Sequence, residues 1–237
     1  MKRAKGNLTP DCLQCEVRPE SAFCGMLSEA EVGFFMKAKK DHAYEKGQAL
    51  FYQGNSCEGI YLLCSGSIKL VKSSDTGQQQ ILEIISPGDW IDKGSFFSSG
   101  RHSATAQALE RSDVCFLSGD AVRQLLKSLP GLPMTLIEAL SRAVEKGRER
   151  THHLASKSAM ARLSEVLVDL GRKHGVKQGR IIRISLLLKR EELAEIVGVT
   201  QETVVRLLTT LKKKKLIALN GREITILESE KLASLKS

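Results

Sequence analysis

No part of the sequence approaches the run of roughly 18 apolar residues that a membrane-spanning helix needs. The first residues, MKRAKGNLTPDC, are basic but contain no apolar segment of the kind that a secretory signal carries. We therefore expect a protein of the cytoplasm without a membrane partner. Structural disulfides are rare in that compartment, so clustered cysteines there are more typical of metal ligands or redox thiols.

The sequence also lacks the short motifs of common enzymes. It has five histidines, and none of them forms the H-E-x-x-H spacing of zinc proteases. It contains neither the G-x-S-x-G motif of α/β-hydrolases nor the glycine-rich loop that binds nucleotide phosphates. We therefore expect a protein that is not an enzyme.

Positive charge is in excess. The formal net charge is +9 and the isoelectric point is about 9.3. A basic protein suits a polyanionic partner, most often nucleic acid. Four consecutive lysines, Lys212 to Lys215, concentrate part of this charge near the C-terminus. The alternative interpretation of such a run is a solvated helix end.

Three of the six cysteines lie in one short segment, DCLQCEVRPESAFCG, at Cys12, Cys15 and Cys24. This spacing suits a metal site, but a zinc or iron–sulfur centre held by four cysteines needs one more thiolate. Cys57 and Cys64 lie in strand-like segments, and we interpret them as buried structural thiols.

The hydrophobic pattern changes from helical to β-type and back. Residues 28–40 predict a short helix with Ser28 as N-cap and Glu31 in a capping box. Between Ala43 and Gly119, recurring glycines separate short β-type runs, which predicts a small all-β sandwich or barrel. These runs are ALFY, GIYLLC, SIKLVKS, QQILEII, DWID, SATAQALE and SDVCFLS.

A longer helix is predicted from about residue 133 to residue 158. Its apolar and small residues recur at alternating spacings of three and four, which is a heptad pattern and predicts a homodimer interface. The interface positions are Ile137, Leu140, Val144, Gly147, Thr151 and Leu154. Gly147 and Thr151 stand where strong coiled coils carry larger apolar residues, so the seam is weak. An ordinary amphipathic helix within one domain is the alternative.

The C-terminal part predicts a winged helix-turn-helix. An amphipathic helix ends at Gly175, and a short helix, a tight turn over residues 198–200 and a second helix capped by Thr200 follow. The segment LIALNGREITIL then predicts two strands joined by a turn at Asn220 and Gly221. This arrangement favours DNA binding over a purely structural helix pair.

At this point the chain resembles the CRP/FNR family of transcription regulators over essentially its whole length. The segment KGQALFYQGNSCEGIYLLCSGSIKLVKSSDTGQQQILEIISPGDWI resembles the family's cyclic-nucleotide-binding jelly roll, and GVTQETVVR resembles the start of its recognition helix, with Glu202 and Arg206 in E-x-x-x-R. The resemblance implies an α+β fold: an N-terminal arm (1–27), a sensory β jelly roll domain (28–132), a long dimerisation helix (133–158) and a winged helix-turn-helix DNA-binding domain (159–237).

The cAMP-binding branch of that family uses a glutamate on the ribose and an Arg-Ser pair on the cyclic phosphate. Here Lys93 aligns with the glutamate and His102-Ser103 with the pair, while Arg101 lies one residue early. Loss of the carboxylate removes a ribose contact, and histidine lacks the fixed fork with which arginine clamps a phosphate. We therefore do not expect cAMP binding.

The chain is more similar to the FNR-like branch, which binds an oxygen-labile [4Fe-4S] cluster through three N-terminal cysteines and one in the roll. The roll cysteine lies in a segment matched here by AQALERSDVCFL. The resemblance therefore implies a [4Fe-4S] cluster on Cys12, Cys15, Cys24 and Cys115, because each iron of the cube lacks one ligand. Structural zinc on the same four residues is an alternative.

These features together predict a transcription regulator that senses oxygen or redox state through a cluster that controls dimerisation. Its partners would be RNA polymerase and a palindromic DNA site with a TGA-like core in each half-site. The residues expected to contact DNA are Gln201, Glu202, Val205, Arg206 and Lys213. The alternatives are a cluster-free regulator that responds to thiol oxidation or a small ligand, and a zinc-binding interaction protein.

Overall fold

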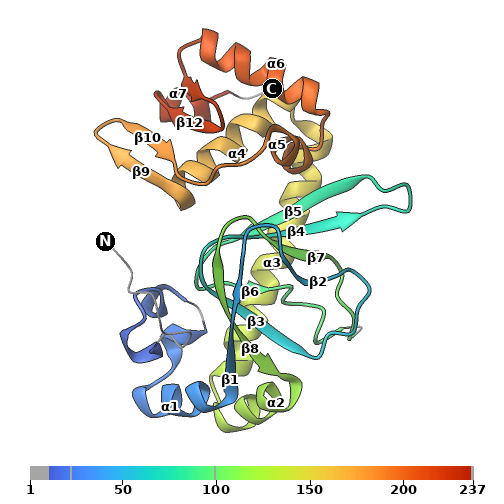
Figure 1. Ribbon diagram of the computed structural model, residues 1–237, viewed down its shortest axis with the longest axis vertical. Coiled ribbons are helices and arrows are strands. Elements are labelled where there is room, and N and C mark those ends of the chain that lie inside the picture. The colour runs from blue at the N-terminus through green and yellow to red at the C-terminus, as the bar shows by residue number, and fades with distance from the viewer. Residues whose placement is uncertain (1–10, 22, 99, 236–237) are drawn as a thin grey trace. The chain divides into compact units, whose positions relative to one another are not determined.

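Figure 1 shows the computed structural model of the chain, which describes residues 11–21, 23–98 and 100–235. The first ten residues of the predicted arm lie outside this description. The chain divides into two compact units, residues 1–145 and 146–237. The break falls inside helix α3 (Leu132–Ser156), and the four-part division expected from the sequence stays a prediction.

The first unit begins with three short 3-10 helices, η1 (Cys12–Gln14), η2 (Arg18–Glu20) and η3 (Cys24–Met26). Helix α1 (Glu29–Ala38) follows, and the predicted capping box between Ser28 and Glu31 is confirmed. The helix ends at Ala38, two residues earlier than expected, because Lys39 already begins strand β1. That strand was missed because its sequence, KKDHAY, is mostly polar.

The predicted β jelly roll is confirmed as two four-stranded antiparallel sheets. One has the order β1-β8-β3-β6 and the other β2-β7-β4-β5. The strands of the first sheet are β1 (Lys39–Tyr44), β8 (Ser112–Ser118), β3 (Gly59–Ser65) and β6 (Trp90–Ile91), and those of the second are β2 (Ala49–Phe51), β7 (Thr105–Ala108), β4 (Ile68–Ser73) and β5 (Gln79–Ile85).

The first sheet carries a hydrophobic core on each of its faces. Leu63 and Val114 point into the roll, whereas Leu62 and Cys115 belong to an outer core, as the alternation of side chains along a strand requires. The outer core is covered by the arm, by α1, by α2 (Gly119–Ser128) and by the start of α3. Its other large members include Phe23, Leu27, Phe35, Leu125, Leu132 and Leu136.

The second unit is a winged helix-turn-helix, as predicted. Helices α5 (Arg190–Val197) and α6 (Gln201–Lys213) are joined at Gly198, whose φ of 73° and ψ of 49° place it in the left-handed region that glycine tolerates best. A four-stranded sheet of order β11-β12-β10-β9 forms the wing. The remaining elements are α4 (Ala159–His174), β9 (Gly175–Gln178), β10 (Ile181–Ile184), β11 (Ile217–Asn220), β12 (Glu223–Ile226) and α7 (Ser229–Ala233).

Two details of this unit differ from the sequence interpretation. The hairpin β9–β10 was not predicted, and Gly175 both caps α4 and begins β9 with an extended backbone. A Cβ at Gly175 would lie 1.9 Å from the carbonyl oxygen of Gly171, which explains the glycine. In the wing, Asn220 still pairs with Glu223, so the turn consists of residues 221 and 222 instead of Asn220 and Gly221.

Candidate functional site

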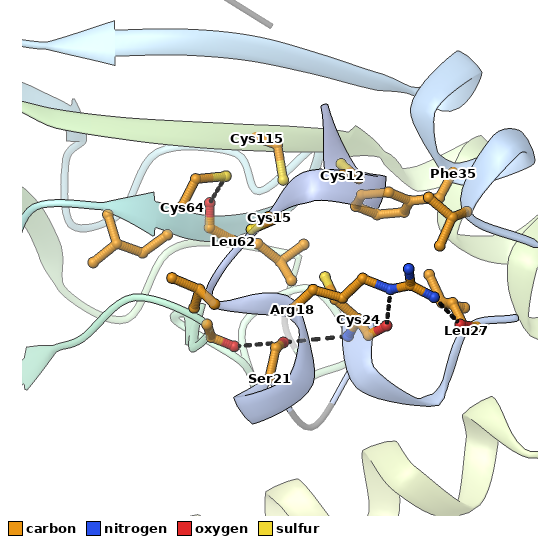
Figure 2. Close-up of a pocket in the computed structure, with 14 residues that line it drawn as sticks. Cys12, Cys15, Arg18, Ser21, Cys24, Leu27, Phe35, Leu62, Cys64 and Cys115 are labelled. Atoms are coloured by element: carbon orange, nitrogen blue, oxygen red, sulfur yellow. Dashed lines mark hydrogen bonds between the residues drawn. The ribbon is translucent and has the colours of Figure 1, made fainter. Parts of the chain in front are cut away.

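Five cysteines line a single pocket between the arm and the outer face of the first sheet, and Figure 2 shows their side chains around it. They are Cys12, Cys15, Cys24, Cys64 and Cys115. The rest of the lining is largely apolar and includes Leu27, Val32, Phe35, Leu62 and Leu63. The structure thus brings the four predicted ligands together, and it adds Cys64, which the sequence did not assign to the site.

The short 3-10 helices of the arm position three of these thiols. Cys12 is the first residue of η1, behind the N-cap Asp11, whose carboxylate accepts a hydrogen bond from the amide of Leu13 at 3.0 Å. Cys15 is the C-cap of the same helix, and Cys24 begins η3.

The guanidinium of Arg18 closes the arm into a compact loop. Its Nε donates to the carbonyl oxygen of Cys24 at 3.4 Å, and its Nη2 donates to that of Leu27 at 2.6 Å. Because the two acceptors are backbone atoms at the first residue and at the C-cap of η3, the side chain of Arg18 keeps η2 and η3 together. This arrangement holds Cys24 next to the segment that carries the other two arm thiols.

The arm is also docked onto the roll. Phe23 is 1% exposed, and its ring packs edge-on against Trp90 of β6 with 4.9 Å between centroids. The hydroxyl of Ser21 donates to the carbonyl oxygen of Gly88 at 2.8 Å and accepts from the amide of Cys24 at 3.2 Å. Apolar burial and the hydrogen bond from the Ser21 hydroxyl to Gly88 therefore fix the arm over the sheet.

The other two thiols lie on neighbouring strands of the sheet. Cys115 of β8 stands opposite Asp41 of β1 on one side and Leu62 of β3 on the other. The register of β3 against β8 shifts between Leu63 and Ser65, which makes Cys64 the extra residue of a β-bulge. Cys64 packs against the outer core with Leu62, and counting by two along GIYLLC would have indicated this shared face.

A buried ion pair stands beside the thiols. Lys39 Nζ lies 2.6 and 2.7 Å from the two carboxylate oxygens of Asp41, and the two side chains are 2% and 9% exposed. Burial lowers the pKa of Lys39, but the hydrogen bond to Asp41 and the nearby thiols of Cys12 and Cys115 raise it by more. The ammonium therefore stays charged next to the cysteines.

The thiols themselves are perturbed in different directions. Burial raises the pKa of Cys24 to about 12, and burial likewise raises that of Cys12. A hydrogen bond between the two sheet cysteines lowers the pKa of Cys64 and, together with burial, raises that of Cys115 well above its usual range. Cys12, Cys24 and Cys115 are thus protonated at neutral pH, and a metal that binds them would release protons.

The donor set fits a thiolate-bound metal or cluster. All of the candidate ligands are cysteine thiols, and thiolates preferentially bind zinc and iron–sulfur clusters. The side chains around them are largely apolar. Within the described part of the chain, however, no three histidine, cysteine, aspartate or glutamate side chains converge closely enough to hold a metal ion.

His102 and Ser103, which align with the phosphate-binding pair of the cAMP-binding branch, both contact the carboxylate of Asp92. Asp92 Oδ2 lies 2.9 Å from Nδ1 of His102, and its Oδ1 accepts from the hydroxyl of Ser103 at 3.0 Å. The His102 ring also stacks on Phe51 with 3.5 Å between centroids. The two side chains aligned with the phosphate-binding pair thus already face an anion from the same chain.

Helix α6 presents one polar face and one buried face. Val204, Leu208 and Leu211 are buried in the second unit. The five residues predicted to contact DNA are all exposed: Gln201, Glu202, Val205, Arg206 and Lys213. The N-cap Thr200 accepts from the amide of Thr203 at 3.3 Å, so α6 begins where a recognition helix was predicted.

The predicted heptad seam runs along α3 and is mostly uncovered in the single chain. Val144 is 54% exposed, and only Leu140 among the six positions is partly covered. The other exposed positions are Ile137, Gly147, Thr151 and Leu154. In contrast, Leu132 and Leu136 at the start of the helix are buried in the outer core.

Comparisons with known proteins agree with this architecture. Residues 41–128 match the cyclic nucleotide-binding domain model, and residues 161–235 match the Crp-like helix-turn-helix domain model. The fold and its DNA-binding domain thus define a regulator with a cyclic-nucleotide-binding-like roll. No helix within residues 11–21, 23–98 and 100–235 is long and apolar enough to cross a membrane.

Curated relatives narrow this class to a family. The chain is 30% identical to the fumarate and nitrate reduction regulatory protein of Salmonella typhimurium over 191 residues, which are 81% of this chain and 76% of the relative. It is 29% identical to the transcriptional activator protein Anr of Pseudomonas protegens over 197 residues, 83% of this chain and 80% of that one. The chain therefore belongs to the CRP/FNR family of DNA-binding transcription regulators.

Solved structures show the same fold. The structure of FixK2 from Bradyrhizobium japonicum aligns with a TM-score of 0.74 at 20% identity, covering 84% of this chain and 98% of that one.

Proposed function

We propose that this regulator senses oxygen or redox state through a [4Fe-4S] cluster on Cys12, Cys15, Cys24 and Cys115. The observation that supports this proposal is the pocket between arm and roll, which gathers all four thiols from segments far apart in the sequence. A bound cluster would supply iron and sulfide that oxygen oxidises. The protein would work in the cytoplasm, and its arm ligands would tie the arm to the sheet.

The packing of the arm suggests how a change at the cysteine pocket could alter the packing of α3, the proposed dimerisation helix. Phe23 and Leu27 of the arm share the outer core with Leu132 and Leu136 of α3. A Cβ at Gly131, immediately before α3, would lie 3.1 Å from Cε of Met26, so the arm also touches the residue that precedes the helix. Movement of the arm would therefore change the packing of the first turns of α3.

Loss of a single roll thiol tests the cluster assignment. Cys115→Ser is expected to abolish cluster assembly, because only three of the four proposed ligands remain for four irons, and the double variant Cys64→Ser/Cys115→Ser shows whether Cys64 substitutes for the lost thiol. Iron and sulfide should be counted on anaerobically reconstituted protein, together with its visible absorbance. The matched control is Cys57→Ser, which removes a half-buried thiol outside the pocket and should leave the iron content unchanged.

Two outcomes would contradict the assignment. Full iron and sulfide content in Cys115→Ser would remove the roll cysteine from the ligand set. Wild-type protein that binds one zinc but no iron or sulfide under the same anaerobic conditions would replace the cluster by the zinc site that the same thiols can form.

We also propose that the protein acts as a homodimer through the exposed seam of α3. The seam includes a glycine at position 147, where a Cβ would meet no atom within 4 Å. A weak seam suits a regulated dimer, because a sensor shifts an equilibrium only by its differential interaction energy with the two states.

Filling the seam should therefore weaken its regulation. Gly147→Leu is expected to shift the cluster-free protein toward dimer, as sedimentation equilibrium would show. Gly147→Ala is the control, since it gains most of the helix propensity, about 1 kcal/mol, without a large side chain. An equal effect of both substitutions would assign the change to helix propensity, and identical dimer constants with and without the cluster would contradict cluster control of dimerisation.

The dimer would present two α6 helices to successive major grooves of a palindromic site. The exposed face of α6 favours half-sites with a TGA-like core, because arginine reads guanine and a valine side chain can pack against the thymine methyl group. RNA polymerase is the expected protein partner.

A further inference from the structure

The pocket holds one thiol more than a four-cysteine cluster uses. Cys12, Cys15 and Cys24 come from the arm, whereas Cys64 and Cys115 come from adjacent strands of one sheet. The two sheet thiols are therefore held by backbone that does not depend on the arm's position. Cys64 has no role in the cluster assignment, so its place in the pocket calls for another explanation.

The two sheet thiols are neighbours in space. Strands β3 and β8 are hydrogen-bonded to each other, and Cys115 stands opposite Leu62, two residues before Cys64. The bulge at Cys64 leaves its side chain on the same face as that of Cys115, and the thiol of Cys115 lies within hydrogen-bonding reach of the Cys64 sulfur. Figure 2 shows both sulfur atoms at the same end of the pocket.

Their surroundings limit reaction with other partners. Cys115 is 2% exposed, and Cys64 is only half-buried, so a small solute reaches Cys64 more easily. Cys57 lies on the segment before β3, where its thiol donates to the carbonyl oxygen of Gly59 at 3.3 Å, and it does not line the pocket. The nearest partner for an oxidised Cys64 on the rigid sheet is therefore Cys115.

We propose that Cys64 and Cys115 are an oxidative modification site, which closes as a disulfide when the cluster-free protein meets a peroxide. The sulfur of Cys64 attacks one peroxide oxygen and breaks the O–O bond, which gives a sulfenic acid and one molecule of water from hydrogen peroxide. The sulfur of Cys115 then attacks the sulfenic sulfur, forms the S–S bond and releases the second water. Two thiols lose two electrons and two protons, and the peroxide is reduced to water.

Disulfide formation would remove the one cluster ligand that the roll contributes. Cys115 cannot bind iron while its sulfur is bonded to Cys64, so the arm thiols alone would face the metal. Reduction by a dithiol would restore both thiols and the ligand set. This consequence rests on the proposed cluster, whereas the disulfide itself requires only the two strands.

The test uses the full-length, cluster-free protein treated with hydrogen peroxide and then with a thiol-alkylating reagent. Peptide mass spectrometry is expected to find the Cys64 and Cys115 peptides cross-linked, with the loss of two hydrogen atoms, and Cys57 still alkylated. Cys57→Ser should give the same cross-link. Cys64→Ser should leave Cys115 without its sheet partner and abolish the cross-link.

The proposal would be overturned if the predominant disulfide joined two arm cysteines. It would also be overturned if Cys64 were still a free thiol after peroxide treatment and were therefore alkylated. Reconstitution with iron and sulfide separates this inference from the proposed cluster. Peroxide-treated wild type should lose its ability to take up iron until a dithiol is added, and Cys64→Ser should keep Cys115 available under the same treatment. A mapped Cys64–Cys115 disulfide in a protein that takes up no iron at all would leave this site intact and contradict only the cluster.

Discussion

Lys39→Met is expected to lower the free energy of unfolding by about 3–5 kcal/mol, because it leaves the buried carboxylate of Asp41 without its cation. The two side chains are almost fully covered, and the ammonium contacts both carboxylate oxygens. Water therefore cannot take over the role of Lys39. Urea denaturation of the cluster-free protein measures this loss. The near-ultraviolet absorbance or the fluorescence of the buried Trp90 monitors the unfolding transition.

Two further variants separate the ion pair from other effects of the substitution. Lys40→Met changes the next residue of the same strand, which is exposed, and should alter stability by no more than about 0.5 kcal/mol. The double variant Lys39→Met/Asp41→Leu removes both charges and should be more stable than the single variant. Equal stability of the single and double variants would show that the cost comes from lost packing instead of the unpaired charge.

Arg206→Ala should weaken binding to the preferred half-site by about 1–3 kcal/mol and relax the preference at one guanine. Arg206 is exposed on the first turns of α6, beside the exposed Glu202 and Val205. A guanidinium at that position can donate two hydrogen bonds, to O6 and N7 of guanine. Titrations of half-site variants at one fixed salt concentration measure both the affinity and the preference.

A lysine near the other end of the helix provides the contrast. Lys213→Gln should weaken binding to all half-sites by a similar factor and reduce the salt slope by about 1, as the loss of a phosphate contact does. If Arg206→Ala also lowered affinity equally for every base at its position, Arg206 would be a phosphate anchor, and the proposed direct reading of guanine would be wrong.

Local patterns in the sequence predicted most of the fold. The capping box at Ser28, the alternation in the β-type runs and the turn before Thr200 each depend on residues within one short segment, and each is present in the structure. Strands β1 and β9 escaped prediction because their polar sequences, KKDHAY and GVKQ, take their structure from the strands beside them, whereas IIRI of β10 is a β-type run that the sequence interpretation did not assign.

The sequence by itself determined the β jelly roll, the winged helix-turn-helix and, through family resemblance, the cysteines at 12, 15, 24 and 115 as a candidate ligand set. Only the tertiary structure decided that Cys64 joins them and that Lys39 and Asp41 form a buried pair beside them. Cys64 and Cys115 lie on neighbouring antiparallel strands, and Lys39 and Asp41 lie on one strand, β1, whose place in the sheet depends on its pairing with β8. Register and a β-bulge set which side chains meet there, and residues far apart in the chain determine both.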